Sequence, residues 1–346
     1  MARKAGVNLT HVALKSGVST TTASMVLSDR WQEFRIAPAT RDQVLAAADE
    51  LGYVAKRSKA KASQRSRLWT IFAPLDFDAG PTSEFFRGVY TYVEDEGLGV
   101  ETVVFPFERD RLRDKASWMR PDFSSGAIMI GLSDEDLAFV ESEDFGIPIV
   151  LVNRVAKNWP SVVTDDYEVG NRVMRHFDER GLTQVAMIMP DYTTRSQSLR
   201  AVGFQDTLRE LRRAAGGDTS AEIPQARAVN DYAGGRRAVE ELIPHLTPST
   251  GVFVLYDHMV GGVIHGLQEH GFTVPGDIEV VSYGNSAVNA LMRPTVTSVA
   301  APIAQMSRDC ARALHQASTV ASDMGSFSRL HDVEIIFRES SPETSP

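Results

Sequence analysis

The stretch that decides the fold of the N-terminal part is residues 8–27, which read NLTHVALKSGVSTTTASMVL. Asn8 precedes an apolar-periodic segment, and its side chain can accept a hydrogen bond from a backbone N–H that the first helical turn leaves without a partner. Gly17 can end this helix because glycine tolerates the left-handed conformation. Ser19 is expected to cap a second helix over 20–27. Two short helices joined by a three- to four-residue turn containing glycine have the spacing of a helix-turn-helix.

A third short helix completes the expected all-α headpiece. It starts with Pro38 in its first turn and runs to Leu51, with Gly52 as its stop. The predicted buried positions of the three helices follow the helical period; they are Val12, Ala13, Ala23, Val26, Leu27, Val44, Leu45, Ala48 and Leu51.

Charge is divided unevenly along the chain. Residues 1–67 carry twelve Lys and Arg against five Asp and Glu, a net charge of +7. The whole chain has 36 basic and 45 acidic side chains, a net of −9, so the remaining 279 residues sum to −16. A cationic end on an anionic body favours a polyanionic partner that binds at that end.

Short hydrogen-bonding side chains gather near the start of the second helix, namely Thr20, Thr21, Thr22 and Ser24. Such groups can meet base edges and phosphates when a recognition helix enters the major groove. A Thr cluster can equally be the solvated face of an ordinary helix. The Ala-x3-Gly-Val-Ser framework that ends at Ser19 favours the DNA-binding interpretation.

These residues give the chain a specific resemblance. The segments 9–19 (LTHVALKSGVS), 23–24 (AS), 40–41 (TR) and 51–53 (LGY) are similar to the headpiece of the lactose/galactose repressor (LacI/GalR) family. The resemblance continues to about residue 338. It implies a sequence-specific transcriptional regulator, expected to be a repressor, which binds a pseudo-palindromic double-stranded DNA operator as a homodimer in the cytoplasm.

The resemblance also implies roles for individual headpiece residues. The base-reading positions are occupied by Thr20, Thr21 and Met25. The positions that contact the DNA backbone are occupied by Ser19, Thr22, Ser24 and Tyr53, and Asn8 and Thr10 at the start of the first helix are further DNA-binding candidates. Because the base-reading threonines are small, the relatives do not predict which bases the preferred operator half-site contains.

The linker 56–67 has six Lys or Arg among twelve residues and no acid. It can be a flexible tether or, as the resemblance implies, a hinge helix that folds on DNA. Arg57 and Lys59 can neutralise phosphates, which predicts salt-dependent affinity. Ala62 stands where the family has a Leu that wedges into the minor groove. Alanine is too small to open a base step, so we expect weaker kinking of the DNA.

Beyond residue 67, short apolar runs alternate with segments of helical period, which predicts parallel sheets covered by helices on both faces. The runs are 68–73, 100–105, 127–130, 147–152, 185–189, 252–255, 278–283 and 333–337. We expect a headpiece over 1–55, a basic hinge over 56–67, and an effector-binding and dimerisation domain over 68–346. The resemblance implies two doubly wound subdomains of periplasmic-binding-protein type. The N-subdomain spans about 68–157 plus 291–321, and the C-subdomain about 158–290 plus 322–340, with crossings near 157, 290 and 322.

In open α/β sheets a ligand binds beyond the carboxyl ends of the strands. The candidates found there, several of them chosen by the resemblance, are Asp76, Phe85, Phe86, Asn153 with its neighbour Arg154, Arg200, Tyr232, Tyr256, Asp257 and Asn285. Arg200 matches the effector-binding arginine of the family, and a guanidinium suits vicinal hydroxyls or a carboxylate. Asp257 can be a helix N-cap instead.

One departure from the family concerns the effector. Gly284 stands where the family has an Asp that receives sugar hydroxyls. The resemblance implies a sugar or a related metabolite as the effector, but this change makes a common sugar less expected. It favours a ligand with fewer hydroxyl donors, a phosphorylated or anionic compound, or no small effector at all. Control by a protein partner, or ligand sensing without operator control, remain as alternatives.

Other chemistry is absent from the sequence. No hydrolase, zinc-protease, P-loop or dinucleotide-binding motif appears, and no His/Cys cluster has metal-ligand spacing, so neither an enzyme nor a cofactor is expected. Cys310 lies on an apolar helical stripe and reads as a small buried hydrophobe, consistent with a reducing cytoplasm. No signal region or membrane span is apparent, which disfavours a periplasmic sugar-binding protein. The polar tail 338–346 offers no heptad for tetramerisation, so a dimer is favoured.

Overall fold

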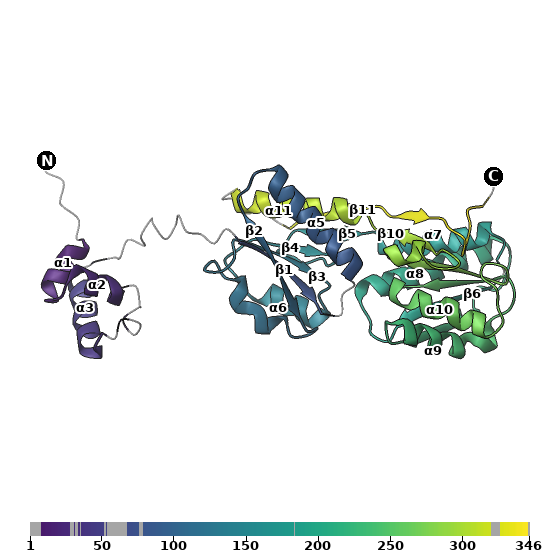
Figure 1. Cartoon of the computed structure of the whole chain (residues 1–346), viewed down its shortest axis with the longest axis horizontal. Coiled ribbons are helices and arrows are strands. Elements are labelled where there is room, and N and C mark those ends of the chain that lie inside the picture. The colour runs from purple at the N-terminus through teal and green to yellow at the C-terminus, as the bar shows by residue number, and fades with distance from the viewer. Residues whose placement is uncertain are drawn as a thin grey trace. The chain divides into compact units, whose positions relative to one another are not determined.

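The computed structural model describes residues 8–27, 31, 34, 36–51, 53, 68–75, 79–182, 184–319 and 326–344. The chain divides into two compact units, Met1–Arg65 and Ser66–Pro346, and each is described by itself (Figure 1). Four predicted site residues lie outside the described residues; they are Arg57, Lys59, Ala62 and Asp76. The expectations about the hinge therefore stay predictions.

The first unit contains α1 (Leu9–Lys15), α2 (Thr20–Leu27) and α3 (Pro38–Glu50). Asn8 caps α1 as predicted, because the backbone N–H of His11 donates to Asn8 Oδ1 at 3.1 Å. The His11 side chain in turn accepts from the Asn8 backbone N–H, which completes a capping box. Gly17 has a φ of +66°, the left-handed conformation that ends α1 and allows the sharp turn into α2.

The core of this unit consists of small apolar residues from all three helices: Val12, Ala13, Ala23, Val26, Val44, Ala47 and Ala48. Leu27 and Leu51 are half-buried against it. One predicted core position is wrong, since Leu45 is 40% exposed and Ala47 takes part in the core instead. The buried positions of α3 follow the spacing i, i+3 and i+4 from Val44, and position 45 points about 100° away from that stripe.

The second unit contains two six-stranded sheets, with strand orders β11-β5-β4-β3-β1-β2 and β12-β10-β9-β8-β6-β7. The strands of the first are β1 (Leu68–Pro74), β2 (Glu101–Phe107), β3 (Gly126–Ile130), β4 (Ile149–Val152), β5 (Ser161–Thr164) and β11 (Ser328–His331). Those of the second are β6 (Gln184–Pro190), β7 (Gln225–Ala228), β8 (Thr250–Val254), β9 (Ile278–Tyr283), β10 (Thr297–Ala300) and β12 (Glu334–Ile336). All described neighbours pair in parallel except β10 and β12.

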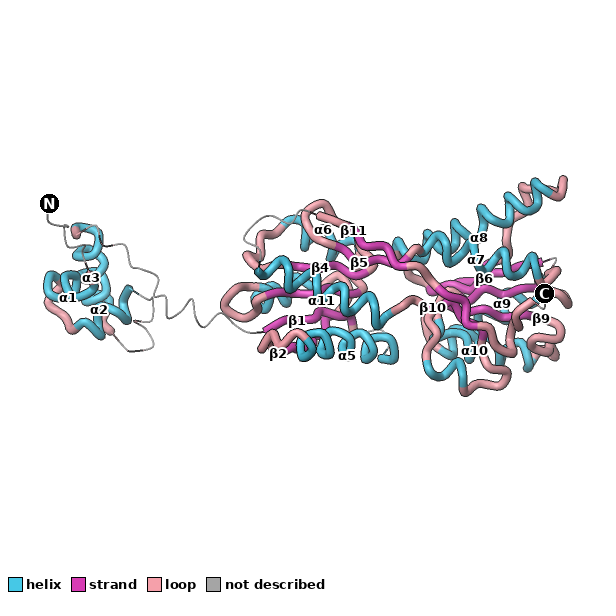
Figure 2. Tube along the Cα trace, turned by 90° about the horizontal axis from the view of Figure 1, so that it is seen from above, coloured by secondary structure: helices cyan, strands magenta, loops and turns pink. Residues whose placement is uncertain are grey.

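Helices cover both faces of each sheet, which confirms the doubly wound fold (Figures 1 and 2). The first sheet packs against α5 (Ala79–Asp95) and α11 (Ile303–Thr319) on one face, and against η1 (Leu112–Met119) and α6 (Asp134–Ser142) on the other. The second sheet packs against α7 (Asp166–Glu179) and α8 (Arg195–Ala214), and against α9 (Tyr232–Leu242) and α10 (Asp257–Glu269). Two short 3-10 helices, η2 (Ile243–His245) and η3 (Ala287–Ala290), complete the described elements. Cys310 is buried on α11 as predicted.

The chain passes between the two sheets three times, but later than predicted. The crossings follow β5, β10 and β11, whereas they were expected near 157, 290 and 322. Strand β5 belongs to the first sheet, so that subdomain extends to about 164 rather than 157. Likewise β10 belongs to the second sheet and β11 to the first. Each predicted boundary was placed ahead of a four-residue strand, which the sequence marks only weakly.

Candidate functional site

The first candidate site is the exposed side of α2. The backbone N–H of Thr22 donates to Ser19 Oγ at 3.0 Å, and the two hydroxyls lie 2.9 Å apart, so both side chains help to cap the helix. Ala23 and Val26 hold the opposite side in the core. Thr20 and Thr21 are exposed, as is Ser24, while Met25 and Tyr53 are half-buried. The surface that α2 presents therefore consists of short hydroxyl side chains at its first turn.

The remaining headpiece candidates lie at the start of α1. Thr10 is exposed. The Asn8 side chain is engaged in the capping box, so it already accepts one hydrogen bond from within the protein. Any DNA contact made by Asn8 would use its remaining hydrogen-bonding capacity.

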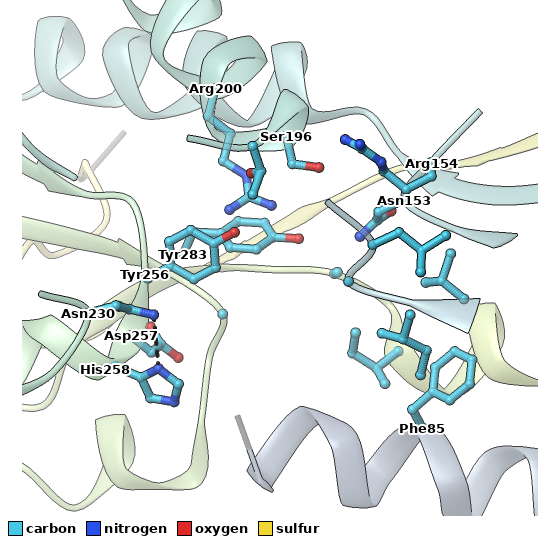
Figure 3. A pocket seen from close by; sticks show the side chains of 18 of the residues that line it. Phe85, Asn153, Arg154, Ser196, Arg200, Asn230, Tyr256, Asp257, His258 and Tyr283 are labelled. Atoms are coloured by element: carbon cyan, nitrogen blue, oxygen red, sulfur yellow. Dashed lines mark hydrogen bonds between the residues drawn. The ribbon is translucent and has the colours of Figure 1, made fainter. Parts of the chain in front are cut away.

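The second candidate site is a cleft between the two sheets of the second unit, at the carboxyl ends of their strands (Figure 3). This is where open parallel sheets bind ligands. From the first-sheet side it is lined by Phe85, Arg109, Ile130, Gly131, Leu132, Val152, Asn153, Arg154, Ile303 and Met306. From the second-sheet side it is lined by Tyr192, Thr194, Ser196, Arg200, Asn230, Tyr256, Asp257, His258, Tyr283, Gly284 and Ala301. The cavity volume is about 150 Å³.

Arg200 is the most buried charged side chain of the cleft, with 2% of its surface exposed. Its Nε donates to Asp166 Oδ1 at 2.8 Å, and its Nη1 donates to the carbonyl of Leu255 at 3.3 Å. Its guanidinium carbon lies 3.3 Å from the centre of the Tyr283 ring and 5.3 Å from that of Tyr256 (Figure 3). Arg200 is thus fixed by an ion pair and two aromatic rings before any ligand binds.

The electrostatics of this group follow from its burial. Desolvation lowers the pKa of Arg200, but the charge of Asp166, the two neighbouring tyrosines and the hydrogen bond to Asp166 together outweigh it, and the net shift of the pKa is upward. Desolvation raises the pKa of Tyr283 to about 12, although the neighbouring arginine acts in the opposite direction. Arg200 is therefore charged and Tyr283 is a neutral phenol at physiological pH.

Two glycines allow the helix that carries Arg200 to approach its neighbour. A Cβ at Gly170 of α7 would lie 2.0 Å from the Arg200 carbonyl oxygen, and a Cβ at Gly203 of α8 would lie 2.0 Å from the Tyr167 carbonyl oxygen. Only glycine permits this backbone-to-backbone crossing. Because Asp166 begins α7, the close crossing brings its carboxylate to the Arg200 guanidinium.

Asp257 lines the cleft, but its carboxylate is committed to the protein. It accepts from Ser282 Oγ at 2.6 Å, from the Ser286 backbone N–H at 2.5 Å and from Asn289 Nδ2 at 2.9 Å. The alternative role as N-cap is not the one observed, because the N-cap of α10 is Tyr256. Asp257 holds together the loop that follows β9.

Gly284 lies in that loop with a φ of +136°, a conformation that other residues rarely adopt. A Cβ at this position would lie 2.7 Å from Asp257 Oδ2. Position 284 therefore lacks the carboxylate of the family, and its backbone conformation also disfavours any side chain there.

The candidates of the first sheet differ in their placement. Phe85 is buried at the edge of the cleft, while Phe86 is half-buried against the apolar cluster beneath α5 and does not line the cleft. Asn153 lines the cleft with a left-handed φ of +54°, and its Oδ1 accepts from the Thr164 backbone N–H at 2.9 Å. That bond joins the ends of β4 and β5.

Two further candidates are not brought to the cleft. Tyr232 is 47% exposed at the start of α9, where its hydroxyl hydrogen-bonds His265. Asn285 has a φ of +57°, and its Oδ1 accepts from Arg338 at 2.6 Å, which directs it toward the C-terminal segment. Among the described candidates, the cleft therefore unites Phe85, Asn153, Arg154, Arg200, Tyr256 and Asp257.

Sequence reasoning missed several polar lining residues. They are Arg109, Tyr192, Thr194, Ser196, Asn230 and His258. Arg109 and Tyr192 each come two residues after a strand, β2 and β6, so the strand-end rule applied to every strand could have found them. Asn230 follows β7, which was not predicted as a strand.

Both candidate sites contain residues that lie in segments matching known protein families. Residues 8–56 match the family described as bacterial regulatory proteins, lacI family, and residues 174–341 match the periplasmic binding protein-like domain. The chain belongs to the lacI family. This lacI-family chain is 24% identical to the HTH-type transcriptional repressor CytR of Escherichia coli K12 over 343 residues, 98% of this chain and 97% of that protein. It is 24% identical to catabolite control protein A of Priestia megaterium over 308 residues, which are 86% of this chain and 88% of that protein.

Solved structures show the same fold. The transcriptional regulator CelR–cellobiose complex superimposes with a TM-score of 0.69 at 23% identity, covering 96% of this chain and 99% of that one. The lac repressor dimer bound to operator and the anti-inducer ONPF superimposes with a TM-score of 0.68 at 21% identity, covering 98% and 100%. The lacI-family protein is a DNA-binding transcriptional regulator, as its relatives are, and not an enzyme.

Two other kinds of feature are absent from the described residues. No group of three or more His, Cys, Asp or Glu in this part of the chain could hold a metal ion. None of the helices in the described segments has both the length and the apolar character that crossing a bilayer requires.

Proposed function

We propose that this lacI-family regulator is a repressor whose affinity for its operator is controlled by a small molecule bound in the cleft. The observation that carries this proposal is the lining of the cleft, to which the subdomains of both sheets contribute residues. A ligand held there contacts both subdomains at once. It therefore favours one arrangement of the two subdomains over another.

The control is a shift between two states of the protein. An effector can change operator affinity only by the difference in its own affinity for those states. Arg200 is held in place by Asp166 and Leu255 without ligand, so its remaining guanidinium donors meet the effector at little further entropic cost. Tyr256 and Tyr283 supply flat aromatic surface on the same side.

DNA recognition is assigned to α2. Thr20 and Thr21 are exposed at its first turn and take the base-reading role, and the backbone contacts are assigned to Ser19, Thr22 and Ser24. The net charge of +7 in residues 1–67 supplies the attraction to phosphates, so binding weakens steeply with salt.

The active form is a homodimer in the cytoplasm. A two-fold symmetric protein presents one α2 to each half of a pseudo-palindromic operator. The related lac repressor structure is a dimer bound to operator, which supports this assembly. Analytical ultracentrifugation at micromolar concentration should give twice the chain mass of 38.0 kDa, and a monomer that still binds a full operator would contradict it.

The proposal is tested by linkage between the two sites. DNA retained by the purified full-length protein is sequenced, and its affinity is measured by fluorescence anisotropy with and without each compound that stabilises the protein in a thermal-shift screen. At least one such compound should change the affinity for DNA by about tenfold, and the DNA should change the affinity for that compound by the same factor. Compounds that bind the cleft yet leave DNA affinity unchanged would show a ligand-binding protein without operator control.

A further inference from the structure

The charged side chains that line the cleft are mostly cationic. Among the described residues that line the cleft, they are Arg109, Arg154 and Arg200, against a single acid, Asp257. Asp257 already accepts from a hydroxyl, a backbone N–H and an amide of the protein. Gly284 offers no side-chain acceptor at all. A neutral polyol donates through its hydroxyls, and the lining carboxylate that would receive them is occupied.

Arg154 differs from Arg200 in how its charge is balanced. Asp166, the partner of Arg200, is buried with it, so that pair is neutral within the protein. Arg154 is only 5% exposed, but it pairs with Asp134, whose side chain is 95% exposed. Water screens the exposed carboxylate and so weakens its hold on the buried guanidinium.

The Arg154 guanidinium also retains a donor that the described residues leave unused. Its Nε is buried and has no hydrogen-bond partner among them. A buried donor attached to a charged group is costly to leave unsatisfied. Figure 3 shows the Arg154 guanidinium directed toward Ser196 and the side of the cleft occupied by Arg200. An acceptor bound there would satisfy the donor and face the Ser196 hydroxyl.

The opposite part of the lining is apolar. Phe85, Ile130, Val152 and Met306 belong to the buried cluster beneath α5 and α11, and Ile303 packs against it. The cavity volume of about 150 Å³ is similar to that of an engineered cavity that holds benzene, which suits a compound of about six carbons. The cleft thus combines an apolar wall with a cationic corner.

We infer that the effector is a small organic anion whose carboxylate or phosphate binds the Arg154 guanidinium and whose carbon skeleton lies on the apolar wall. The planar guanidinium accepts either group through two parallel hydrogen bonds. This inference rests on the proposed function, because it assigns the chemistry of the compound that the same cleft binds.

The test is calorimetric titration of the full-length protein, at constant ionic strength, with compounds paired by skeleton. The pairs are glucuronate with glucose, gluconate with glucitol, benzoate with benzamide, and ribose 5-phosphate with ribose. At least one anion should bind at least about tenfold more tightly than its neutral counterpart. The first three pairs report on a carboxylate and the last on a phosphate.

Variants separate a binding role of Arg154 from a structural one. Arg154→Gln should weaken the anion about tenfold, whereas Asp134→Asn should leave it unchanged or strengthen it, because a competing carboxylate is removed. A purely structural ion pair would make both substitutions weaken binding alike. Arg154→Lys, which keeps the charge but lacks the planar fork, serves if Arg154→Gln does not fold, and should give an intermediate loss. The control is Arg175→Gln, which removes an exposed arginine paired with Glu210 on the second sheet's outer helices.

The outcomes distinguish the two proposals. The anion assignment is overturned if neutral compounds bind as tightly as their charged counterparts, if no anion binds below 10 mM (roughly the weakest binding expected of a built site), or if Arg154→Gln binds the anion unchanged. A neutral sugar that binds and alters DNA affinity overturns only this assignment. An anion that binds through Arg154 without altering DNA affinity supports the site and contradicts operator control.

Discussion

Replacing Arg200 with alanine should destabilise the second unit severely, before any effect on effector binding is considered. Asp166 lies beside Arg200 with 3% of its surface exposed, so the substitution leaves a buried carboxylate without its counter-ion. Removing one partner of a buried pair costs about 3–5 kcal/mol. At about 2–4 °C per kcal/mol for a domain of this size, the melting temperature should fall by ~6–20 °C.

The assay is scanning calorimetry of the full-length, ligand-free protein, with urea unfolding as a second measure. The double variant Arg200→Met, Asp166→Asn is the matched control, because it removes both charges and keeps most of the volume. Neutral replacement of a buried pair costs little, so this variant should recover more than half of the lost free energy of unfolding.

Two results would refute the reasoning. A loss below about 1 kcal/mol in Arg200→Ala would mean that Asp166 does not depend on Arg200 for its charge balance. Equal instability of the single and double variants would mean that lost packing, and not the unpaired carboxylate, is responsible. The prediction also bears on function, since a loss of effector response in Arg200→Ala is informative only in samples shown to be folded.

Three further predictions concern other parts of the chain. Gly284→Asp should lower stability by more than about 1 kcal/mol in urea unfolding and should not create a sugar site, because the left-handed backbone and Asp257 oppose a side chain there; an unchanged midpoint would argue against this geometry. Burial lowers the pKa of His176 by more than the charge of Glu279 raises it. The neutral form of His176 therefore contributes stability that is complete above about pH 6.5 and is lost as the pH falls below that value. The melting temperature should therefore drop between pH 7.5 and 5.5, and less so in His176→Gln; an equal drop in both would count against His176. Ala62→Leu should increase DNA bending in circular-permutation gel shifts, and a sharp central kink already present in the unsubstituted protein would show that Ala62 does not limit it.

The helices of the headpiece could be predicted closely because local signals define them. Asn8, Gly17 and Pro38 each fix a helix boundary through backbone chemistry that depends only on neighbouring residues. Periodicity alone could not decide whether Leu45 is buried, because a buried helical stripe through Val44 and Ala48 can include either position 45 or position 47. The burial of Ala47, a residue compatible with core or surface, decided the packing.

The cleft was only partly predictable. Arg200 and Tyr256 were found by applying the strand-end rule together with the family resemblance. The structural role of Asp257, by contrast, depends on the hydrogen bonds that its carboxylate accepts from Ser286 and Asn289, about thirty residues later in the chain. Such long-range hydrogen bonds leave no local signature. The same holds for Tyr232, whose place on the exterior follows from how α9 packs.

The short strands explain the displaced subdomain boundaries. Strands β5, β10 and β11 have four residues each, too few to show a clear period. They exist because neighbouring strands pair with them, as Leu151 and Val152 of β4 do with β5. The family resemblance therefore indicated how often the chain crosses between the sheets more reliably than where it does so.

The central claim is that α2 reads DNA sequence, and selection from a random duplex pool tests it most directly. Full-length protein should enrich a pseudo-palindromic sequence at moderate salt, and a Thr20→Ala, Thr21→Ala double variant should relax the preference within each half-site. The control Thr319→Ala, an exposed position on α11, should select the same sequence as the unsubstituted protein. Recovery of no common sequence, or identical selection by the double variant, would contradict the account.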